Sequence, residues 1–244
     1  MAHALIDADS FCYVAAILAA NESEEQARFN LNAMLEDTLI DLNTKDYTLF
    51  ITDNTNNFRN KVYPEYKANR KDVPKPLHLQ MLKEHIRDEW KALVSDGCEA
   101  DDMVGVHHFQ HNAESIIVSI DKDLDQYYGW HWNPKKKERY LISPEQATRF
   151  FYYQLLVGDT ADNIKGCKGI GPKKAEKLLA QCETEEEMFN MCRDSYGCDE
   201  ELEMNAICLH LWREMDDIWK WPSWASPKEN ICDFSRYNFS DKET

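Results

Sequence analysis

Three short apolar runs in this sequence each stop at an aspartate. The runs are residues 4–6 before Asp7, 47–52 before Asp53 and 116–120 before Asp121. One aspartate at such a place usually caps a helix or stabilises a turn, but three in one chain favour a shared role. Carboxylates that gather at one place raise one another's pKa and need a counter-charge. Hard divalent cations such as Mg²⁺ or Mn²⁺, which prefer oxygen ligands, would supply it.

Further acids follow at spacings that suit the same role. Asp121 and Asp123 stand two apart, so in an extended chain both project to one side, ~6.5 Å apart. Asp159 and Asp162 are three apart and would meet on one face of a helical turn. The full candidate set is Asp7, Asp53, Glu99, Asp101, Asp102, Asp121, Asp123, Asp159 and Asp162. Two divalent ions ~3.5–4 Å apart promote in-line displacement at phosphorus, so such a cluster would hydrolyse phosphodiesters.

The runs that carry these acids have the composition of strands buried on both faces, as in a parallel sheet. Helix-length stretches lie between them, at residues 24–42 and 77–93. This alternation predicts an α/β fold in three layers, α/β/α. Ligands of open parallel sheets bind beyond the carboxyl ends of the strands. The acids are therefore expected to converge on one crevice.

A glycine-rich segment follows a helix predicted from Ser143-Pro144 to just before Gly158. Gly166, Gly169 and Gly171 permit a tight hairpin, and Pro172 would start the next helix. Backbone N–H groups near a helix N-terminus bind phosphate, and lysines add attraction that is independent of sequence. An ordinary turn would not explain the three lysines in the first two turns of that helix. We interpret the segment as a DNA-binding hairpin comprising Gly166, Lys168, Gly169, Gly171, Lys173, Lys174 and Lys177.

Four motifs resemble those of the flap-endonuclease and 5′→3′ exonuclease family. They are Tyr66-Lys67-Ala68-Asn69-Arg70, Glu99-Ala100-Asp101-Asp102, Ser119-Ile120-Asp121-Lys122-Asp123-Leu124 and the string from Gly158 to Lys173. Similar strings occur in the 5′-nuclease domain of bacterial DNA polymerase I and in exonucleases of T5-like and T7-like phages. The resemblance spans Asp7 to about Leu179. It implies a PIN-like nuclease core with a mostly parallel sheet, followed by a helix–three-turn–helix (helix-hairpin-helix) DNA-binding subdomain.

Carried over position by position, the resemblance implies metal ligation by all nine acids. It also implies that Lys67 and Arg70 contact the scissile phosphate, where an arginine could be bidentate. The cofactors would be two Mg²⁺, replaceable by Mn²⁺, and K⁺ bound by carbonyls near residues 167–171. One ion would activate a water and the other would stabilise the leaving 3′-oxygen. The products would carry 5′-phosphates.

The expected organisation is a nuclease core over residues 1–140, a DNA-binding subdomain over 141–225 and a tail over 226–244. The tail could be an ordered cover or a docking segment for a replication protein. We expect Asp9 to cap the helix after Asp7. Leu209, Trp212 and Met215 have helical spacing, which indicates a helix packed on the core.

Net charge, apolar runs and cysteine spacing limit the classes of protein to which this chain can belong. A net charge of −16 is unusual for a DNA-binding chain, so we expect a basic face opposed to an acidic bulk. No apolar run approaches the ~20 residues of a membrane span, and no signal peptide is indicated. A cytoplasmic protein is therefore expected, in the host cytoplasm if it is phage-encoded. The eight cysteines form no CxxC pair, so we expect reduced thiols rather than a zinc site.

The sequence thus predicts a metal-dependent 5′→3′ exonuclease or structure-specific 5′-flap endonuclease, monomeric, in phage-type DNA replication or recombination. Its substrate would be DNA with 5′ ends, nicks or flaps, or an RNA primer. Two alternatives remain open. A PIN-class ribonuclease would share the core and its acids but lack the hairpin. A non-catalytic DNA-structure-binding scaffold would gain nothing from keeping acids that repel one another.

Overall fold

The computed structural model describes residues 2–53 and 55–227. These residues form two compact units, each built from separated stretches of chain. The first unit contains the chain up to Asn57, Pro74–Pro144 and Leu211–Asp217. The second contains Phe58–Val73, Glu145–His210 and the chain from Ile218 onward. The division near residue 140 stays a prediction.

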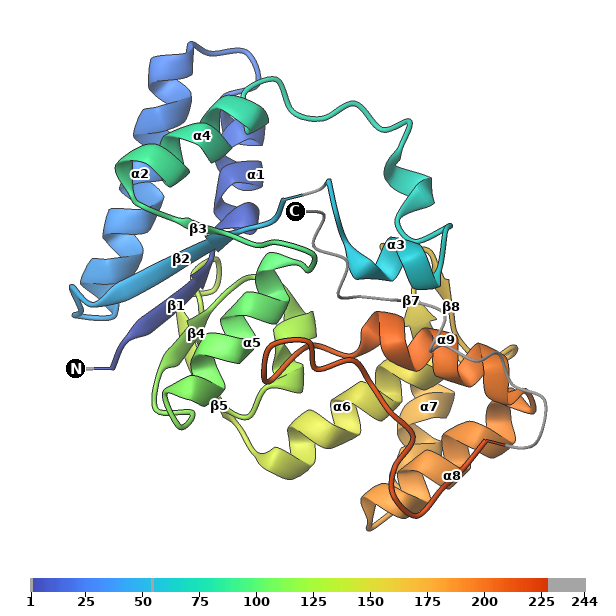
Figure 1. Ribbon diagram of the computed structural model, residues 1–244. Helices are drawn as coiled ribbons and strands as arrows, with labels where there is room; N and C mark the ends of the chain where they lie inside the picture. Colours follow the sequence, from blue (N-terminus) through green and yellow to red (C-terminus); the bar gives the residue numbers. More distant parts are fainter. Residues whose placement is uncertain (1, 54, 228–244) are drawn as a thin grey trace, which may run out of the picture. The chain divides into compact units, whose positions relative to one another are not determined.

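A six-stranded sheet forms the centre of the first unit (Figure 1). Its strands are β1 (Ala4–Asp7), β2 (Tyr47–Ile51), β3 (Leu93–Val94), β4 (Ile116–Val118), β5 (Gly129–Asn133) and β6 (Glu138–Ile142), in the order β3-β2-β1-β4-β5-β6. Every neighbouring pair is parallel except β5 with β6. The predicted mostly parallel sheet is confirmed.

Helices cover both faces of this sheet. They are α1 (Ala8–Leu18), α2 (Glu24–Asp41), α4 (Leu79–Glu89) and α5 (Ala100–Gln110), with a 3₁₀ turn, η2, at Lys122–Gln126. Strand side chains alternate between the faces: Ala4 and Ile6 of β1 pack with α1, α2 and α4, whereas Leu5 packs with α5. The same alternation holds in β2 and β4. The predicted α/β/α layering is confirmed (Figure 1).

The second unit is mainly helical. It contains α3 (Phe58–Val62), a 3₁₀ turn η1 (Ala68–Arg70), α6 (Pro144–Val157), α7 (Pro172–Leu179), α8 (Glu185–Tyr196) and α9 (Asp199–Leu209). A short antiparallel pair, β7 (Gly158–Asp159) and β8 (Ile164–Lys165), lies between α6 and α7 in the sequence. The helix–hairpin–helix arrangement therefore has the predicted order. In the described part of the chain, no helix is long and apolar enough to cross a membrane.

A buried arginine closes the end of α9. The side chain of Arg59 is 1% exposed, and its guanidinium donates to the carbonyl oxygens of Cys208 (2.8 Å) and His210 (2.9 Å). The last carbonyls of a helix lack intrahelical donors and carry a partial negative charge. Arg59 therefore supplies both hydrogen bonds and positive charge, and it joins α3 to the end of α9.

The helix expected from the spacing of Leu209, Trp212 and Met215 does not form beyond Leu209. Helix α9 ends at Leu209, and His210 is already extended, with φ −65° and ψ 129°. Leu211 then packs in the core cluster between the sheet and α5. The Trp212 N–H donates to Asp102 (3.2 Å), and its carbonyl accepts the Tyr127 hydroxyl (2.9 Å). The backbone groups of Trp212 thus make long-range hydrogen bonds in place of helical ones.

We predict that Gly105→Ala destabilises the first unit. A Cβ at Gly105 would lie 2.1 Å from the Tyr127 ring and 2.3 Å from the Trp212 carbonyl oxygen. Overpacking of this kind outweighs the higher helix propensity of alanine and should lower the free energy of unfolding by ~2 kcal/mol. Urea unfolding measures it. Gln110→Ala, at an exposed position of the same helix, is the control, and equal stability of the two variants would contradict the packing described.

Candidate functional site

The acid-bearing segments of the first unit meet at one edge of the sheet. Strand β1 lies between β2 and β4 and is parallel to both. Asp7 is the last residue of β1, Asp53 follows β2 by two residues, and Asp121 follows β4 by three. All three therefore follow the carboxyl ends of neighbouring strands, where open parallel sheets bind ligands. We call this the acid edge.

Asp7 is the most constrained carboxylate of the acid edge. Its side chain is buried, with 4% exposure, and accepts a hydrogen bond from the Ser119 hydroxyl at 2.9 Å. Burial, together with the charges of Asp9 and Asp121, raises its pKa from 3.8 to about 7, against the opposing effect of the Ser119 hydrogen bond. A carboxylate in this position is unfavourable when charged, and a bound cation would relieve it.

Asp9 does not cap helix α1, contrary to expectation. Asp7 is the N-cap residue, because its Oδ1 accepts the N–H of Asp9 at 3.2 Å. The side chain of Asp9 points instead toward strand β2 and helix α4. One oxygen accepts the Thr52 N–H (2.9 Å), and the other lies 2.5 Å from the Lys83 ammonium. Asp9 is thus an acid-edge carboxylate with its own cation.

Glu99 and Asp102 form a capping box at the start of α5. Asp102 is fully buried, and its oxygens accept the N–H groups of Glu99 (2.9 Å) and Trp212 (3.2 Å). Glu99 accepts the side-chain amide of Asn57 at 2.9 Å. Asp101, between them, accepts the Tyr127 hydroxyl on its backbone carbonyl (3.1 Å). Asp102 therefore orients the N-terminal turn that carries the other two acids.

The remaining acids of this edge are engaged with nearby backbone. Asp53 accepts the N–H of Thr55, and Asp121 accepts the N–H of Asp123, each at 2.9 Å. Aspartates commonly stabilise turns in this way. Among the residues that the structure describes, no three His, Cys, Asp or Glu side chains are placed so that they could hold an ion as they stand.

In the second unit, three side chains of the Tyr66–Arg70 motif contact the carboxylate of Asp162. Its carboxylate accepts the Tyr66 hydroxyl and an Arg70 guanidinium N–H, both at 2.8 Å, and lies 3.5 Å from the Lys67 ammonium. The Asn69 amide donates to the Thr160 carbonyl at 2.8 Å. Asp159 accepts the N–H of Ala161 at 2.7 Å. The structure thus brings Lys67, Arg70 and Asp162 together and ties η1 to the turn after Asp159.

Two glycines allow the β7–β8 pair to pack closely. Gly158 has φ +75°, and a Cβ there would lie 2.2 Å from the Gly166 nitrogen. Gly169 also has positive φ, +76°, whereas Gly171 is the extended N-cap residue of α7. Gly166 therefore permits close backbone packing here, and its role in binding DNA stays a prediction. The exposed residues of the segment include the four predicted lysines, Lys168, Lys173, Lys174 and Lys177.

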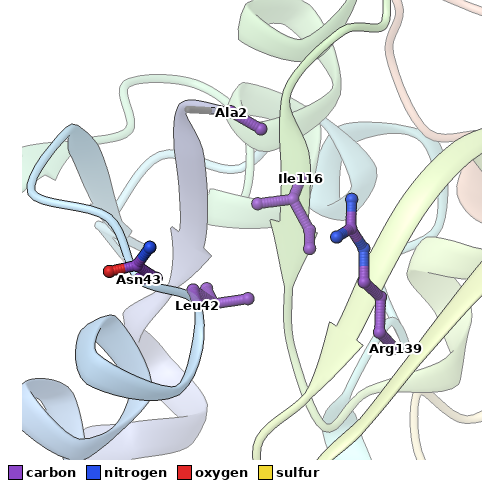
Figure 2. Close-up of a pocket in the computed structure, with 5 residues that line it drawn as sticks. All are labelled: Ala2, Leu42, Asn43, Ile116 and Arg139. Carbon is purple, nitrogen blue, oxygen red and sulfur yellow. The ribbon is translucent and has the colours of Figure 1, made fainter.

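A small hollow in the first unit lies away from the acid edge (Figure 2). It has a volume of about 200 Å³ and is lined by Ala2, Leu42, Asn43, Ile116 and Arg139. Ala2 precedes β1 and Ile116 begins β4, so the hollow is at the amino ends of these strands. It is not part of the site that the acids form.

Sequence reasoning missed several residues that position the acids. Tyr66 and Asn69 were part of a quoted motif, and Ser119 was part of another, so their proximity in sequence to the acids was a usable signal. Thr52 directly precedes Asp53 and gave the same signal, whereas Lys83 gave none. Lys83 is in the middle of a helix, far along the chain from Asp9, and only the packing of α4 brings it to the acid edge.

Comparison with known proteins agrees with these observations. Residues 2–147 match the family described as 5′-3′ exonuclease, N-terminal resolvase-like domain, and residues 142–220 match 5′-3′ exonuclease, C-terminal SAM fold. A 5′-3′ exonuclease of Mycoplasma pneumoniae is 34% identical over 152 residues, 54% of this chain and 52% of the relative. The flap endonuclease Xni of Vibrio cholerae is 31% identical over 185 residues, 66% of this chain and 70% of the relative. The chain thus spans about half the length of the Mycoplasma relative.

Among solved structures, the fold resembles a bacteriophage T5 flap endonuclease in complex with DNA and metal ions. The TM-score is 0.66 at 17% identity, over 84% of this chain and 88% of that one. At this identity the likeness concerns the fold alone. The two family matches together extend from residue 2 to residue 220, and the chain therefore belongs to the 5′-3′ exonuclease family, which includes the flap endonucleases.

Proposed function

We propose that this chain is a metal-dependent 5′-nuclease that hydrolyses DNA phosphodiesters at 5′ ends, nicks or flaps and leaves 5′-phosphates. The observation that carries the proposal is the burial of Asp7 beside Asp9 and Asp121, at an edge where three strands deliver acids. Such an arrangement is costly for the fold. Bound divalent cations would offset that cost by neutralising the carboxylates, in agreement with the family to which the chain belongs.

The proposed metal site draws on all nine candidate acids. In the first unit they are Asp7, Asp53, Glu99, Asp101, Asp121 and Asp123, with Asp102 acting through its hydrogen bond to Glu99. For Asp159 and Asp162, in the second unit, the role is proposed from the family motif alone. The donors are all carboxylate oxygens, which suit Mg²⁺ or Mn²⁺ and disfavour softer metals. Bound divalent ions would supply an activated water and neutralise charge at the phosphate.

The chain's own residues would orient and stabilise the reacting phosphate. We propose that Lys67 and Arg70 donate to its non-bridging oxygens, where negative charge increases in the transition state. Both are held by Asp162 in the structure, so binding of the phosphate would exchange one anionic partner for another. Arg70 also donates through Nε to the Ala161 carbonyl at 2.8 Å, a contact that would keep its guanidinium in place during this exchange.

The hairpin and α7 are proposed to bind the DNA backbone. Lys173, Lys174 and Lys177 are exposed, while Ala175 and Leu179 on the same helix are buried. The lysines thus form a basic strip on a chain of net charge −16. Lys174 already contacts the Gly169 carbonyl at 3.3 Å, which supports cation binding, including K⁺, by carbonyls of this turn. The predicted docking tail, residues 226–244, falls almost entirely outside the described residues.

We predict that Asp121→Asn abolishes cleavage without abolishing DNA binding. The loss of one anionic ligand should reduce turnover by more than ~10²-fold. The assay follows end-labelled duplex, nicked and 5′-flap DNA, and an RNA of matched sequence, with Mg²⁺, Mn²⁺ or EDTA, and gel shift measures binding. Asp37→Asn, the same chemical change at an exposed site on α2, is the control. Binding without cleavage of any substrate by the wild type would indicate a scaffold, and cleavage of RNA alone would indicate a PIN-class ribonuclease.

Charge reversal on α7 should weaken DNA binding at every sequence. We expect the Lys173→Glu, Lys174→Glu double variant to bind duplex DNA about tenfold more weakly, and its affinity should depend less steeply on salt concentration. Fluorescence anisotropy at several salt concentrations measures both quantities. A matched double variant, Lys45→Glu and Lys91→Glu, reverses two exposed charges of the first unit. Equal losses in the two variants would contradict a specific role for α7.

Asp7→Asn should stabilise the metal-free protein at pH 8. The pKa of Asp7 is raised from 3.8 in the unfolded chain to about 7 in the folded one, so its ionisation opposes folding as the pH rises through this window. The gain should be on the order of 4 kcal/mol at pH 8 and should disappear toward pH 4. Chemical denaturation in EDTA measures it, with Asp37→Asn as the control. A gain that does not depend on pH would contradict the assignment.

A further inference from the structure

We propose that Lys83 of helix α4 is a positioning residue that keeps Asp9 out of the metal site and fixes the spacing of the acid-bearing segments. The inference rests on the proposed metal site at the acid edge. It concerns a pair of residues outside the motifs, and it gives α4 a role in setting how many carboxylates an ion meets.

The first observation is the geometry of the pair. Lys83 Nζ lies 2.5 Å from Asp9 Oδ1, and the two side chains are only 16% and 27% exposed. Helix α4 is anchored on either side of Lys83, because Leu82 and Ile86 are fully buried in the core cluster with α1 and α2. The ammonium is therefore brought to Asp9 by packing, unlike an exposed ion pair whose long side chains must be ordered at an entropic cost.

The second observation is that Asp9 and Lys83 both form hydrogen bonds with the backbone of Thr52. Asp9 accepts the Thr52 N–H at 2.9 Å, and Lys83 donates to the Thr52 carbonyl at 3.2 Å. The Thr52 hydroxyl oxygen accepts the Ala100 N–H at 2.9 Å. Thr52 directly precedes Asp53, and Ala100 lies between Glu99 and Asp101. One connected network thus ties together three segments that carry proposed ligands.

The third observation concerns charge. The backbone N–H of Asp9 donates to the Asp7 carboxylate at 3.2 Å, so the two acids are close neighbours. An unpaired Asp9 would add a full negative charge two residues from Asp7, and cation affinity rises with the number of ligand charges. The Lys83 ammonium neutralises that charge and forms an ion pair with one of the Asp9 carboxylate oxygens. Asp9 therefore lies close to the proposed metal ligands but has a structural role, because its carboxylate is paired with Lys83.

The two partners should therefore have opposite effects on metal affinity. Lys83→Met leaves Asp9 unpaired, so we expect Mg²⁺ to bind at least about fivefold more tightly, while turnover falls because the ion is misplaced. Asp9→Asn leaves the ammonium unpaired and should weaken Mg²⁺ binding by a similar factor. The double variant Asp9→Asn, Lys83→Met should return close to the wild-type affinity, and Lys83→Arg, which keeps the charge, should change it little.

The test is calorimetric titration of each variant with Mg²⁺ in the absence of DNA, combined with melting in EDTA. Arg87→Met is the matched control, because Arg87 is one turn along α4 and pairs with Asp88 instead (2.7 Å). Opposite shifts for the two single variants, cancelled in the double variant, support the proposal. A lower melting temperature of Lys83→Met with unchanged Mg²⁺ affinity would reduce Lys83 to a structural role and overturn it. A wild type that binds neither Mg²⁺ nor Mn²⁺ would overturn the proposed function itself, and this inference with it.

Discussion

The mutual repulsion of carboxylates at the carboxyl edge of the sheet is the constraint around which the first unit is organised. Parallel strands deliver Asp7, Asp53 and Asp121 to the same edge, and burial limits how far solvent can screen the charge of Asp7. The surrounding elements compensate locally. The Ser119 hydroxyl donates to Asp7, the first turn of α5 contains a capping box, and α4 supplies an ammonium. The layers therefore do more than enclose a core, since each contributes a donor to the edge.

The second unit meets the same electrostatic problem by another route. Asp162 is compensated by two cationic side chains and a phenol, whereas Asp7 is compensated mostly by hydroxyl and peptide groups. A carboxylate that is already paired with cations is stable when charged, while one that relies on neutral donors in a buried position favours its protonated form.

Much of this architecture was accessible from the sequence because it depends on local pattern. Apolar runs that stop at acids fixed the strands and the edge, and Pro172 after Gly171 marked the start of α7. The remainder depends on contacts between distant parts of the chain. Helical spacing at Leu209 and Trp212 was overridden because Asp102 and Tyr127 bind the backbone of Trp212. No local pattern in α4 indicated that Lys83 would reach Asp9.

The segment around Leu211 and Trp212 has a consequence for biosynthesis. The amino-terminal family match ends at residue 147, yet Leu211–Asp217 belongs to the first unit. The Trp212 N–H donates to Asp102, and the Trp212 carbonyl accepts the Tyr127 hydroxyl. A nascent chain emerges from the ribosome amino terminus first. The sheet and α5 can assemble early, but the first unit cannot complete its core until more than sixty further residues have been translated. The segment matched by the family and the compact unit of the structure therefore do not coincide in this protein.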